Sequence, residues 1–403
     1  MEKLLYLVHR IPFPPNKGDK IRSYHLLKYL SERYEVHLGA FVDDPADFEY
    51  VGELEKLSQS HFFCPLDPGK AKVRSLQGFF RRQALSLPYY RDGRMQRWVD
   101  EVLHSHDIHT VICFSSVMSQ YVLGKQYDGL TRIADFVDID SDKWRQYSER
   151  KSFPMNHVYR REARRLLDFE RRVARCFDRC LFVSGKEADL FRQYAPESSA
   201  RIGYFNNGVD FSYFSPDHVE SNPYTGDGKH IVFTGAMDYW ANIDAVSWFA
   251  RDIFPRLRET LAGLEFYIVG INPTEQVRAL EKLPGIRVTG AVPDVRPYLA
   301  HAELVVAPLR IARGVQNKVL EAMSMGRPVV LTSSAMEGIE PTELLSRRVA
   351  DSPAQFAEHC LQVLQSGDQA ETGRQARAFV EDVYAWEKSL SCMETLLSSR
   401  GTT

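Results

Sequence analysis

A short loop in the second half of the chain combines positive charge with a glycine. A strand is expected to end at Ala307 and a helix to begin near Asn317. Between and just after them lie the charged residues and the glycine: Arg310, Arg313, Gly314 and Lys318. Main-chain N–H groups at the start of a helix, together with the helix dipole, favour a bound anion. The loop therefore predicts a phosphate-binding site.

One turn into this helix stands Glu321. Its carboxylate is placed to accept hydrogen bonds from vicinal hydroxyl groups such as those of a ribose. The alternative is a capped surface helix in which Lys318 and Glu321 form an i,i+3 pair worth about 0.2–0.5 kcal/mol. The coincidence of cations, glycine and acid in one post-strand loop favours the ligand site.

A second cluster follows the predicted strand Arg132–Val137 and is acidic. Its carboxylates are Asp135, Asp138, Asp140 and Asp142. Three interpretations stay open: a metal site of hard oxygen ligands, a catalytic or substrate-orienting carboxylate at Asp138 or Asp140, and a helix start capped by Ser141 or Asp140.

The loop after the first strand is rich in proline and charge. Gly18 would let the main chain approach a bound sugar or phosphate, and Asp19 and Arg22 lie beside it. We expect these residues at a ligand cleft. The alternative is a proline-rich turn that caps the helix predicted over 23–33.

Short apolar runs alternate with amphipathic ones, which predicts parallel sheets flanked by helices. The predicted strands are Leu4–Val8, Val36–Phe41, Val111–Phe114, Arg132–Val137, Leu181–Val183, His230–Thr234, Leu264–Val269, Ile286–Thr289, Leu304–Ala307 and Pro328–Thr332. Longer helical runs include 241–262 and 317–325. The pattern restarts after a Pro-, Asn- and Gly-rich stretch, so two doubly wound α/β domains are expected. We place them at 1–205 and 229–375, joined by a linker over 206–228. A C-terminal helix over 376–403, carrying Trp386, is expected to return to the first domain.

Composition supports a globular chain in the cytoplasm. The 403 residues are 44% hydrophobic and 26% charged, with a net charge of −2, which argues against a general nucleic-acid binder. Residues 1–201 hold 33 Lys and Arg against 28 Asp and Glu; the remainder holds 18 against 25. The six cysteines lack zinc-ligand spacing and fit reduced thiols. The first apolar run is too short for a signal segment.

The helical run 159–176 contains seven arginines interleaved with acids. Two interpretations stay open: peripheral contact with an anionic lipid surface, or a solvated helix with internal ion pairs.

The Gly314–Met323 segment resembles the nucleotide-sugar signature of retaining GT-B glycosyltransferases of family 4. That signature has two glutamates separated by seven residues, the second followed by Ala-Met. Glu321 matches the second glutamate, whereas the first position holds Arg313. Asn207-Gly208-Val209-Asp210 resembles the family's interdomain segment. The Asp135–Trp144 cluster, the first-strand loop and the run Tyr159–Glu170 resemble the members associated with exosortase/PEP-CTERM exopolysaccharide systems.

The resemblance implies a GT-B fold, with two Rossmann-like domains facing across a cleft, and transfer from a nucleoside-diphosphate sugar to a saccharide or lipid-linked acceptor. It implies no metal or other cofactor. Lys318 and Arg310 would stabilise the leaving diphosphate, and Asp138 or Asp140 would act on the acceptor. The donor-binding residues would be Gly235, Asn242, Arg313, Gly314, Val315, Gln316, Asn317 and Glu321. The cleft residues on the acceptor side would be Gly18, Asp19, Arg22 and Asn207.

Other nucleotide-binding classes lack their signatures in this chain. The dinucleotide fingerprint GxGxxG and the phosphate loop GxxxxGK[ST] are both absent. A GT-B sugar-nucleotide epimerase and a non-catalytic nucleotide-sugar-binding protein stay open as alternatives.

Overall fold

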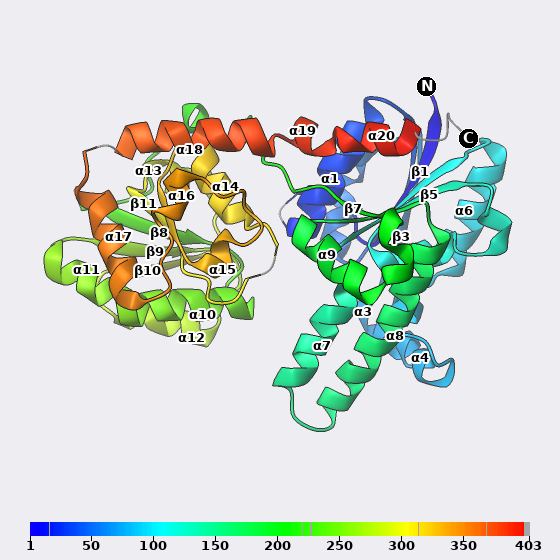
Figure 1. Ribbon diagram of the computed structural model, residues 1–403, viewed down its shortest axis with the longest axis horizontal. Coiled ribbons are helices and arrows are strands. Elements are labelled where there is room, and N and C mark those ends of the chain that lie inside the picture. Colours follow the sequence, from blue (N-terminus) through cyan, green and yellow to red (C-terminus); the bar gives the residue numbers. More distant parts are fainter. Residues whose placement is uncertain (16, 220, 226–227, 313, 368, 399–403) are drawn as a thin grey trace. The chain divides into compact units, whose positions relative to one another are not determined.

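The structure is a computed structural model, and it describes residues 1–15, 17–219, 221–225, 228–312, 314–367 and 369–398 (Figure 1). The chain divides into two compact units. The first comprises Met1–Asn206 and Leu390–Thr403, and the second comprises Asn207–Ser389. Each unit is built on its own parallel sheet, so the predicted α/β class with two sheet domains is confirmed.

The first unit has a seven-stranded sheet in the order β3-β2-β1-β4-β5-β6-β7, and every pair is parallel. The strands are β1 Lys3–Val8, β2 Glu35–Val42, β3 Ser60–Pro65, β4 Thr110–Phe114, β5 Thr131–Val137, β6 Arg179–Phe182 and β7 Ile202–Tyr204. The central strands are buried along almost their whole length, which explains their continuous apolar sequence. The two edge strands, β3 and β7, are missing from the sequence prediction.

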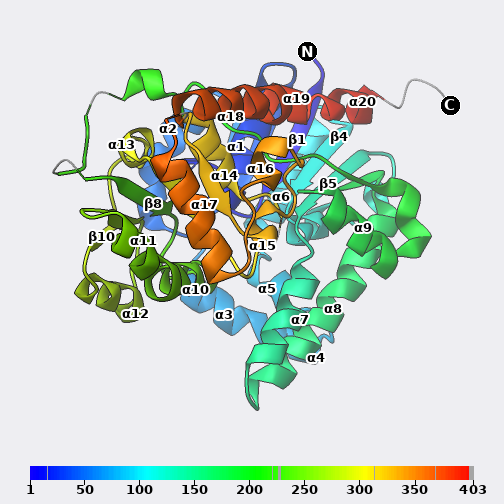
Figure 2. The ribbon, with the colours of Figure 1, turned by 60° about the vertical axis from the view of Figure 1, so that its left-hand side comes forward.

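Helices pack against this sheet (Figures 1 and 2). The α-helices of the unit are α1 Gly18–Ser31, α2 Val51–Glu55, α3 Pro68–Ser75, α4 Gln77–Phe80, α5 Ser86–Tyr89, α6 Gly93–Ser105, α7 Asp140–Arg150, α8 Met155–Cys176, α9 Gly185–Tyr194 and α20 Cys392–Ser398. Short 3₁₀ turns are η1 Pro45–Tyr50, η2 Ser116–Tyr121, η3 Lys125–Tyr127 and η4 Pro196–Arg201. α7 and α8 form a helical hairpin that projects from the sheet (Figure 1).

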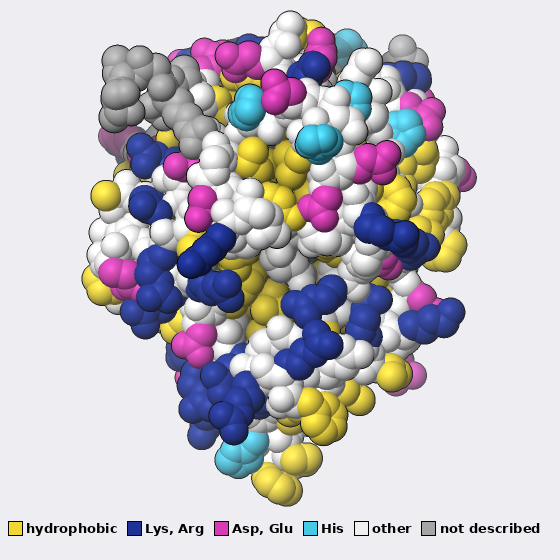
Figure 3. Space-filling model, turned by 90° about the vertical axis from the view of Figure 1, so that its right-hand side faces the viewer, with side chains coloured by type: hydrophobic (Ala, Val, Ile, Leu, Met, Phe, Trp, Pro, Cys, Tyr) yellow, Lys and Arg dark blue, Asp and Glu magenta, His cyan; other side chains and the backbone are white. Residues whose placement is uncertain are grey.

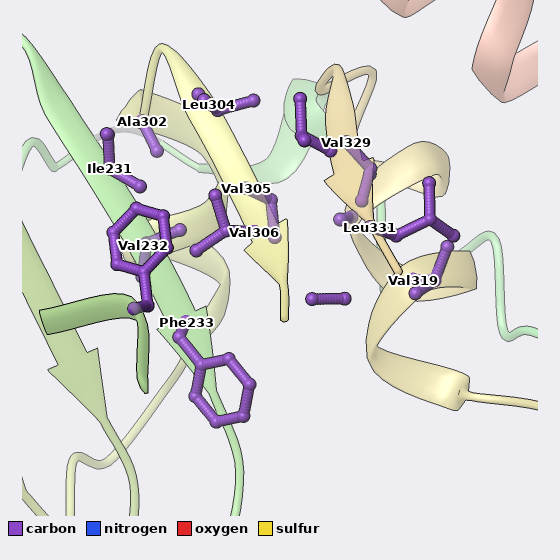
Figure 4. Packing of buried hydrophobic residues seen from close by; sticks show 14 of the residues in the cluster. Ile231, Val232, Phe233, Ala302, Leu304, Val305, Val306, Val319, Val329 and Leu331 are labelled. Carbon is purple, nitrogen blue, oxygen red and sulfur yellow. The ribbon is translucent and has the colours of Figure 1, made fainter. Parts of the chain in front are cut away.

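The second unit has a five-stranded parallel sheet in the order β10-β9-β8-β11-β12. Its strands are β8 His230–Thr234, β9 Glu265–Val269, β10 Ile286–Gly290, β11 Leu304–Ala307 and β12 Val329–Leu331. Figure 4 shows the apolar side chains of β8, β11 and β12, with Val319 of the following helix beside Leu331. All five strands coincide with predicted ones to within one or two residues.

The helices of the second unit follow the strands. They are α10 Trp240–Trp248, α11 Phe254–Thr260, α12 Glu275–Arg278, α13 Arg296–His301, α14 Asn317–Ser324, α15 Ser333–Met336, α16 Glu343–Ser346, α17 Pro353–Gln365, α18 Gln369–Tyr384 and α19 Trp386–Leu390. Shorter turns are η5 Pro216–His218 and η7 Ala279–Lys282, and a π-helical turn, η6 Phe249–Ile253, joins α10 to α11. The predicted helix over 241–262 therefore corresponds to two α-helices, α10 and α11, joined by a π-helical turn.

The segment expected as a linker packs onto the second unit. The Val209 N–H donates to the Tyr384 carbonyl oxygen at 2.8 Å, and the Tyr224 hydroxyl donates to the Tyr298 carbonyl oxygen at 2.6 Å. Trp386 lies against Gly208, where a β-carbon would come within 2.7 Å of the indole. Trp386 therefore packs against Gly208 within the second unit. Farther along, Glu394 of α20 belongs to the first unit.

Both sheets have a point where the strand order reverses direction. In the first sheet it lies between β1 and β4, and in the second between β8 and β11. Loops at the carboxyl ends of such neighbouring strands diverge and leave room for a ligand. The loop after β8 and the Pro308–Gln316 loop after β11 thus flank the switch point of the second sheet.

Candidate functional site

In the second unit, a glycine after β8 leaves room for the side chain of a lysine. Gly235 follows β8 with φ +155°, in the region that favours glycine. A β-carbon there would lie 2.7 Å from Asn242 Nδ2 and 3.1 Å from Lys318 Nζ. Only glycine leaves space for these two side chains, so the sequence predictions of Gly235, Asn242 and Lys318 meet at one place.

Lys318 is held at this place by polar and aromatic contacts. Its Nζ donates to Asn242 Oδ1 at 2.7 Å and lies 4.2 Å from the centroid of the Phe233 ring. Asn242 Nδ2 in turn donates to the Ala236 carbonyl oxygen at 2.8 Å. The ammonium group keeps a fixed position at the carboxyl end of β8, with donor capacity beyond its one amide partner.

Lys318 and Glu321 share a poorly hydrated environment, and both side chains are half-buried. Burial lowers the pKa of Lys318 to about 7, against the opposing effect of the Glu321 carboxylate. Burial raises the pKa of Glu321 to about 7, against the opposing effect of Lys318. Both groups therefore change charge near neutral pH, and an incoming anion would favour the protonated lysine.

The start of α14 completes the geometry of the phosphate site. Its N-cap residue, Gln316, makes no capping hydrogen bond with its side chain; Gln316 Nε2 donates instead to the Gly314 carbonyl oxygen at 3.1 Å. Gly314 has φ +62° and is buried, as is Val315. The Asn317 side chain accepts a 3.4 Å hydrogen bond from Asn207 Nδ2. The predicted donor residues around α14 and the predicted cleft residue Asn207 therefore lie together in the second unit.

Arg310, in the same loop, differs from Lys318. Arg310 forms a two-pronged ion pair with Asp244, with its Nε 3.0 Å from Asp244 Oδ2, and lies over the Trp248 ring. The hydrogen bond and charge of Asp244 raise the Arg310 pKa. Arg310 is thus already paired on α10, and its predicted catalytic part stays a prediction. Arg313 lies outside the described residues.

In the first unit, the acids after β5 surround a lysine. Lys143 Nζ lies 2.9 Å from Asp138 Oδ2 and 3.2 Å from Asp140 Oδ1. Burial opposes the charge of Lys143, but the two carboxylates prevail and raise its pKa. Within the residues that the structure describes, no group of His, Cys, Asp and Glu side chains is arranged to hold a metal ion. Asp138 and Asp140 therefore form an anionic pair bridged by an ammonium group.

A strained residue positions this acidic turn. Val137 has φ +68°, an uncommon conformation for a β-branched side chain, and the pairing of β5 with β6 shifts register there. α7 begins at Asp140 after Ile139, without a capping side chain of its own. The N–H of Ser141 donates to Glu170 Oε1 at 3.2 Å, and its hydroxyl binds the other oxygen of the same carboxyl. The predicted capping by Ser141 or Asp140 is wrong, because Glu170 of α8 takes that place.

Asp19 lies near the carboxyl end of β1, in the first turn of α1. Its Oδ2 lies 2.7 Å from Arg10 Nη1 and 3.4 Å from His9 Nε2. Burial opposes ionisation of Asp19, but His9 and Arg10 lower its pKa well below the ordinary value. Gly18 is exposed at the start of α1, with open space around its α-carbon.

Arg22 was predicted to line a ligand cleft, and the structure shows that this prediction is wrong. Its side chain is completely buried, and it binds Asp135 through Nε at 2.8 Å and Nη2 at 3.1 Å. The guanidinium also donates to the carbonyl oxygens of Phe205 and Phe182 and lies 3.5 Å from the Phe205 ring. Arg22 therefore joins α1 to β5, β6 and the end of β7, and its side chain is not exposed at a cleft.

Sequence reasoning missed several polar residues at the carboxyl edge of the first sheet. His9 stacks on Phe114 and meets Tyr90 edge-on. Burial is the main cause that raises the Tyr90 pKa. Tyr89 and then the carboxylates of Asp43 and Asp140 add to it, against the effect of Arg10. His9 could have been found from the sequence, because it directly follows a buried strand. No sequence feature indicated Tyr90, since it comes from a distant helical segment.

The chain is similar to known proteins in part of its second unit and in its fold. Residues 228–366 match the family model described as glycosyl transferases group 1. Among curated proteins the comparison finds no match.

The fold is similar to solved structures over nearly all of the chain. HepE from Anabaena, in complex with UDP, is 15% identical, with 98% of this chain and 100% of that one covered at a TM-score of 0.64. WaaG, a glycosyltransferase involved in lipopolysaccharide biosynthesis, is 14% identical, with 98% and 100% covered at 0.66. A UDP-forming trehalose-phosphate synthase from Burkholderia xenovorans is 10% identical, with both chains fully covered at 0.66. The chain has the fold of GT-B glycosyltransferases, and within its second unit residues 228–366 match the glycosyl transferase group 1 model.

Proposed function

We propose that the protein transfers a sugar from a UDP-sugar to a saccharide or lipid-linked acceptor. The observation that carries the proposal is the Lys318 ammonium group, fixed 2.7 Å from Asn242 Oδ1 beside Gly235 and next to the start of α14. This arrangement stands at the switch point of a sheet within the part of the chain that matches the glycosyltransferase family.

The donor diphosphate would bind between the loop after β8 and the start of α14. Lys318 and the first N–H groups of α14 would face its oxygens, and Glu321 would accept hydrogen bonds from the ribose hydroxyls. Uridine is the proposed base because HepE has been crystallised with UDP and with UDP-glucose. The pocket would be shaped by the main chain of four predicted donor-binding residues, Gly314, Val315, Gln316 and Asn317.

In the transfer, an acceptor hydroxyl oxygen forms a bond to the anomeric carbon, and the bond from that carbon to the diphosphate oxygen breaks. Both bonding electrons leave with UDP, and the hydroxyl proton passes to the departing phosphate oxygen. Negative charge therefore grows on the diphosphate oxygens that face Lys318 and the start of α14. Fixed donors at that place lower the barrier most. Attack from the same face would retain the anomeric configuration. The proposed chemistry takes its positive charge from the chain and needs no metal.

The acceptor is proposed to bind at the carboxyl edge of the first sheet. Asp138 and Asp140 would orient its hydroxyl groups, with Asp19 nearby on α1. A lipid-linked saccharide from exopolysaccharide assembly is the proposed class, with the enzyme in peripheral contact with the cytoplasmic membrane face. The support is the resemblance of the first-strand loop and the Asp135–Trp144 cluster to that enzyme group. No helix in the described part of the chain is long and apolar enough to cross a bilayer.

The test is an assay with UDP-glucose, UDP-galactose, GDP-mannose and ADP-glucose, each with a short-chain polyprenyl-diphosphate monosaccharide, with and without a chelator. We expect transfer from a UDP-sugar, an α-anomeric product from an α-linked donor by NMR, and full activity in the chelator. Donor hydrolysis or epimerisation without transfer would contradict the transferase proposal in favour of the epimerase alternative. Binding without any turnover would favour a nucleotide-sugar-binding protein.

A further inference from the structure

Large apolar side chains stand in solvent at one end of the first unit. Phe80 of α4 is 88% exposed, Phe153 at the tip of the α7–α8 hairpin 78%, and Val73 of α3 69%. Leu76, Phe79 and Met155 in the same segments are also exposed. Single exposed apolar residues are ordinary, but a group of this size needs an explanation.

The same segments are strongly cationic. Residues 68–82 contain five Lys and Arg and no Asp or Glu, and residues 151–165 contain five against a single acid, Glu162. That acid is buried, and its carboxylate accepts hydrogen bonds from the main chain of Leu85 and Ser86. Six of these cations form no ion pair within the residues that the structure describes: Lys72, Arg81, Arg82, Lys151, Arg160 and Arg164.

The two segments form one surface because α4 is fastened to α8. Arg161 Nη2 donates to the carbonyl oxygens of Gly78 at 2.7 Å and Gln83 at 3.2 Å, and its guanidinium lies 4.6 Å from the Phe79 ring centroid. With Phe79 held by Arg161, Phe80 points outward. Figure 3 shows dark-blue Lys and Arg side chains gathered over the lower part of this face, with yellow apolar side chains among them and at its lower end. We call the exposed part of residues 68–82 and 151–165 the α4–α8 surface.

We propose that the α4–α8 surface docks on an anionic phospholipid bilayer, with Phe80 and Phe153 inserted at the headgroup level. Exposed rings provide apolar insertion, and each unpaired cation near an anionic lipid surface strengthens binding about fivefold. A second copy of the chain fits poorly, because the surface would meet its own positive charge. This rests on the proposed function and deepens it, since it names the surface, apart from either substrate site, that makes the proposed membrane contact.

The arrangement also separates the arginines of α8 into two groups. Arg171 pairs with Glu197 of η4 at 2.9 Å, and Arg165 pairs with Asp168 of α8 at 3.6 Å. Arg160 and Arg164, nearer the hairpin tip, form no ion pair with a residue that the structure describes. The helix therefore keeps one ion pair within itself, and lipid contact near its tip stays a prediction.

The experiment is flotation of the full chain with vesicles of phosphatidylcholine alone or of phosphatidylcholine mixed with phosphatidylglycerol. We expect binding to the anionic vesicles only, with loss of binding as salt is raised. The double variant Phe80→Ser/Phe153→Ser should bind about tenfold or more weakly, and Lys72→Gln/Arg82→Gln/Arg160→Gln should lose nearly all binding.

Matched controls come from the second unit. Ile271→Ser removes an apolar side chain that is 41% exposed, and Arg347→Gln removes an exposed cation; both should bind like the wild type. Thermal unfolding should be unchanged in all variants, because the replaced side chains are exposed. Failure of the wild type to float with anionic vesicles overturns the proposal, as does undiminished binding by the Phe80→Ser/Phe153→Ser variant. Equal binding to neutral vesicles would overturn the part assigned to charge.

Discussion

Two cation–carboxylate couples, one in each unit, occupy similar places and behave differently. Arg22 is on α1, which follows β1, and Lys318 is on α14, which follows β11; both strands border the switch point of their sheet. Arg22 is completely buried and forms two hydrogen bonds with Asp135 and two with main-chain carbonyl oxygens. Lys318 is half-buried and binds one amide oxygen, with Glu321 one turn away.

The difference separates a structural charge from one available to a ligand. The guanidinium of Arg22 has its donors satisfied by the chain, so a ligand would gain little from it and the fold would lose much without it. Lys318 is fixed in position with donors to spare, in surroundings that lower its pKa. The type of residue and its place after a strand are the same; the number of satisfied donors distinguishes the two.

The largest expected effect tests the structural half. Arg22→Met should lower the free energy of unfolding by about 3–5 kcal/mol, because Asp135 would stay buried without its partner. Urea unfolding followed by circular dichroism measures this. Lys56→Met, which disrupts an exposed i,i+3 pair with Glu53, should cost at most about 0.5 kcal/mol. An Arg22→Met protein as stable as the wild type would show that this couple is not structural.

The next effect tests the ligand half. Lys318→Ala should lower kcat by about 10²-fold or more, because the leaving diphosphate loses its nearest fixed cation. Steady-state rates with a UDP-sugar measure it, and the unfolding temperature should hardly change. Lys282→Ala, at an exposed lysine of the same unit, is the matched control. A wild-type rate in Lys318→Ala would refute the assigned part.

A smaller effect concerns Glu321. Glu321→Ala should weaken UDP binding about tenfold or more, since hydrogen bonds to a charged acceptor contribute about 1.5–3 kcal/mol. Calorimetric titration with UDP measures the change. Unaltered affinity would mean that Glu321 affects only the pKa of Lys318 and does not contact the ribose.

The pH dependence sharpens the same comparison. Lys318 loses its charge as pH rises through about 7, and Glu321 gains its charge over the same range. UDP affinity should therefore be greatest near neutral pH and fall severalfold on both sides. Lys318→Arg keeps its charge at higher pH, so the alkaline decline should disappear. A decline that persists in Lys318→Arg would assign it to another group.

The sequence predicted most of the fold because continuous apolar runs mark buried parallel strands. It missed β3 and β7, since Ser60–Pro65 is a partly exposed edge strand and Ile202–Tyr204 has only three residues. Gly235 and Lys318, which the resemblance assigns to the donor site, do lie next to each other. Arg22 was misassigned because a charged residue near a glycine-containing loop looks exposed. Its partner, Asp135, lies 113 positions away, with no local sign of the pairing.

Charge pattern was a weaker guide where tertiary contacts decide. Glu170 looked like one more acid in an arginine-rich helix, yet it is buried against Ser141, and burial raises its pKa to about 8. Arg310 looked equivalent to Lys318 until Asp244 of α10 was seen to hold it. Neither partner is visible in the spacing of the residues themselves.

The central claim is that Lys318 and the start of α14 form a seat for a pyrophosphate group, and calorimetric titration with UDP and with uridine tests it most directly. In the wild type, UDP should bind at least about tenfold more tightly than uridine, as expected for a charge-assisted contact. In Lys318→Ala this advantage should largely vanish while uridine affinity stays the same. If the variant keeps the full preference for UDP, the pyrophosphate binds elsewhere and the account is contradicted.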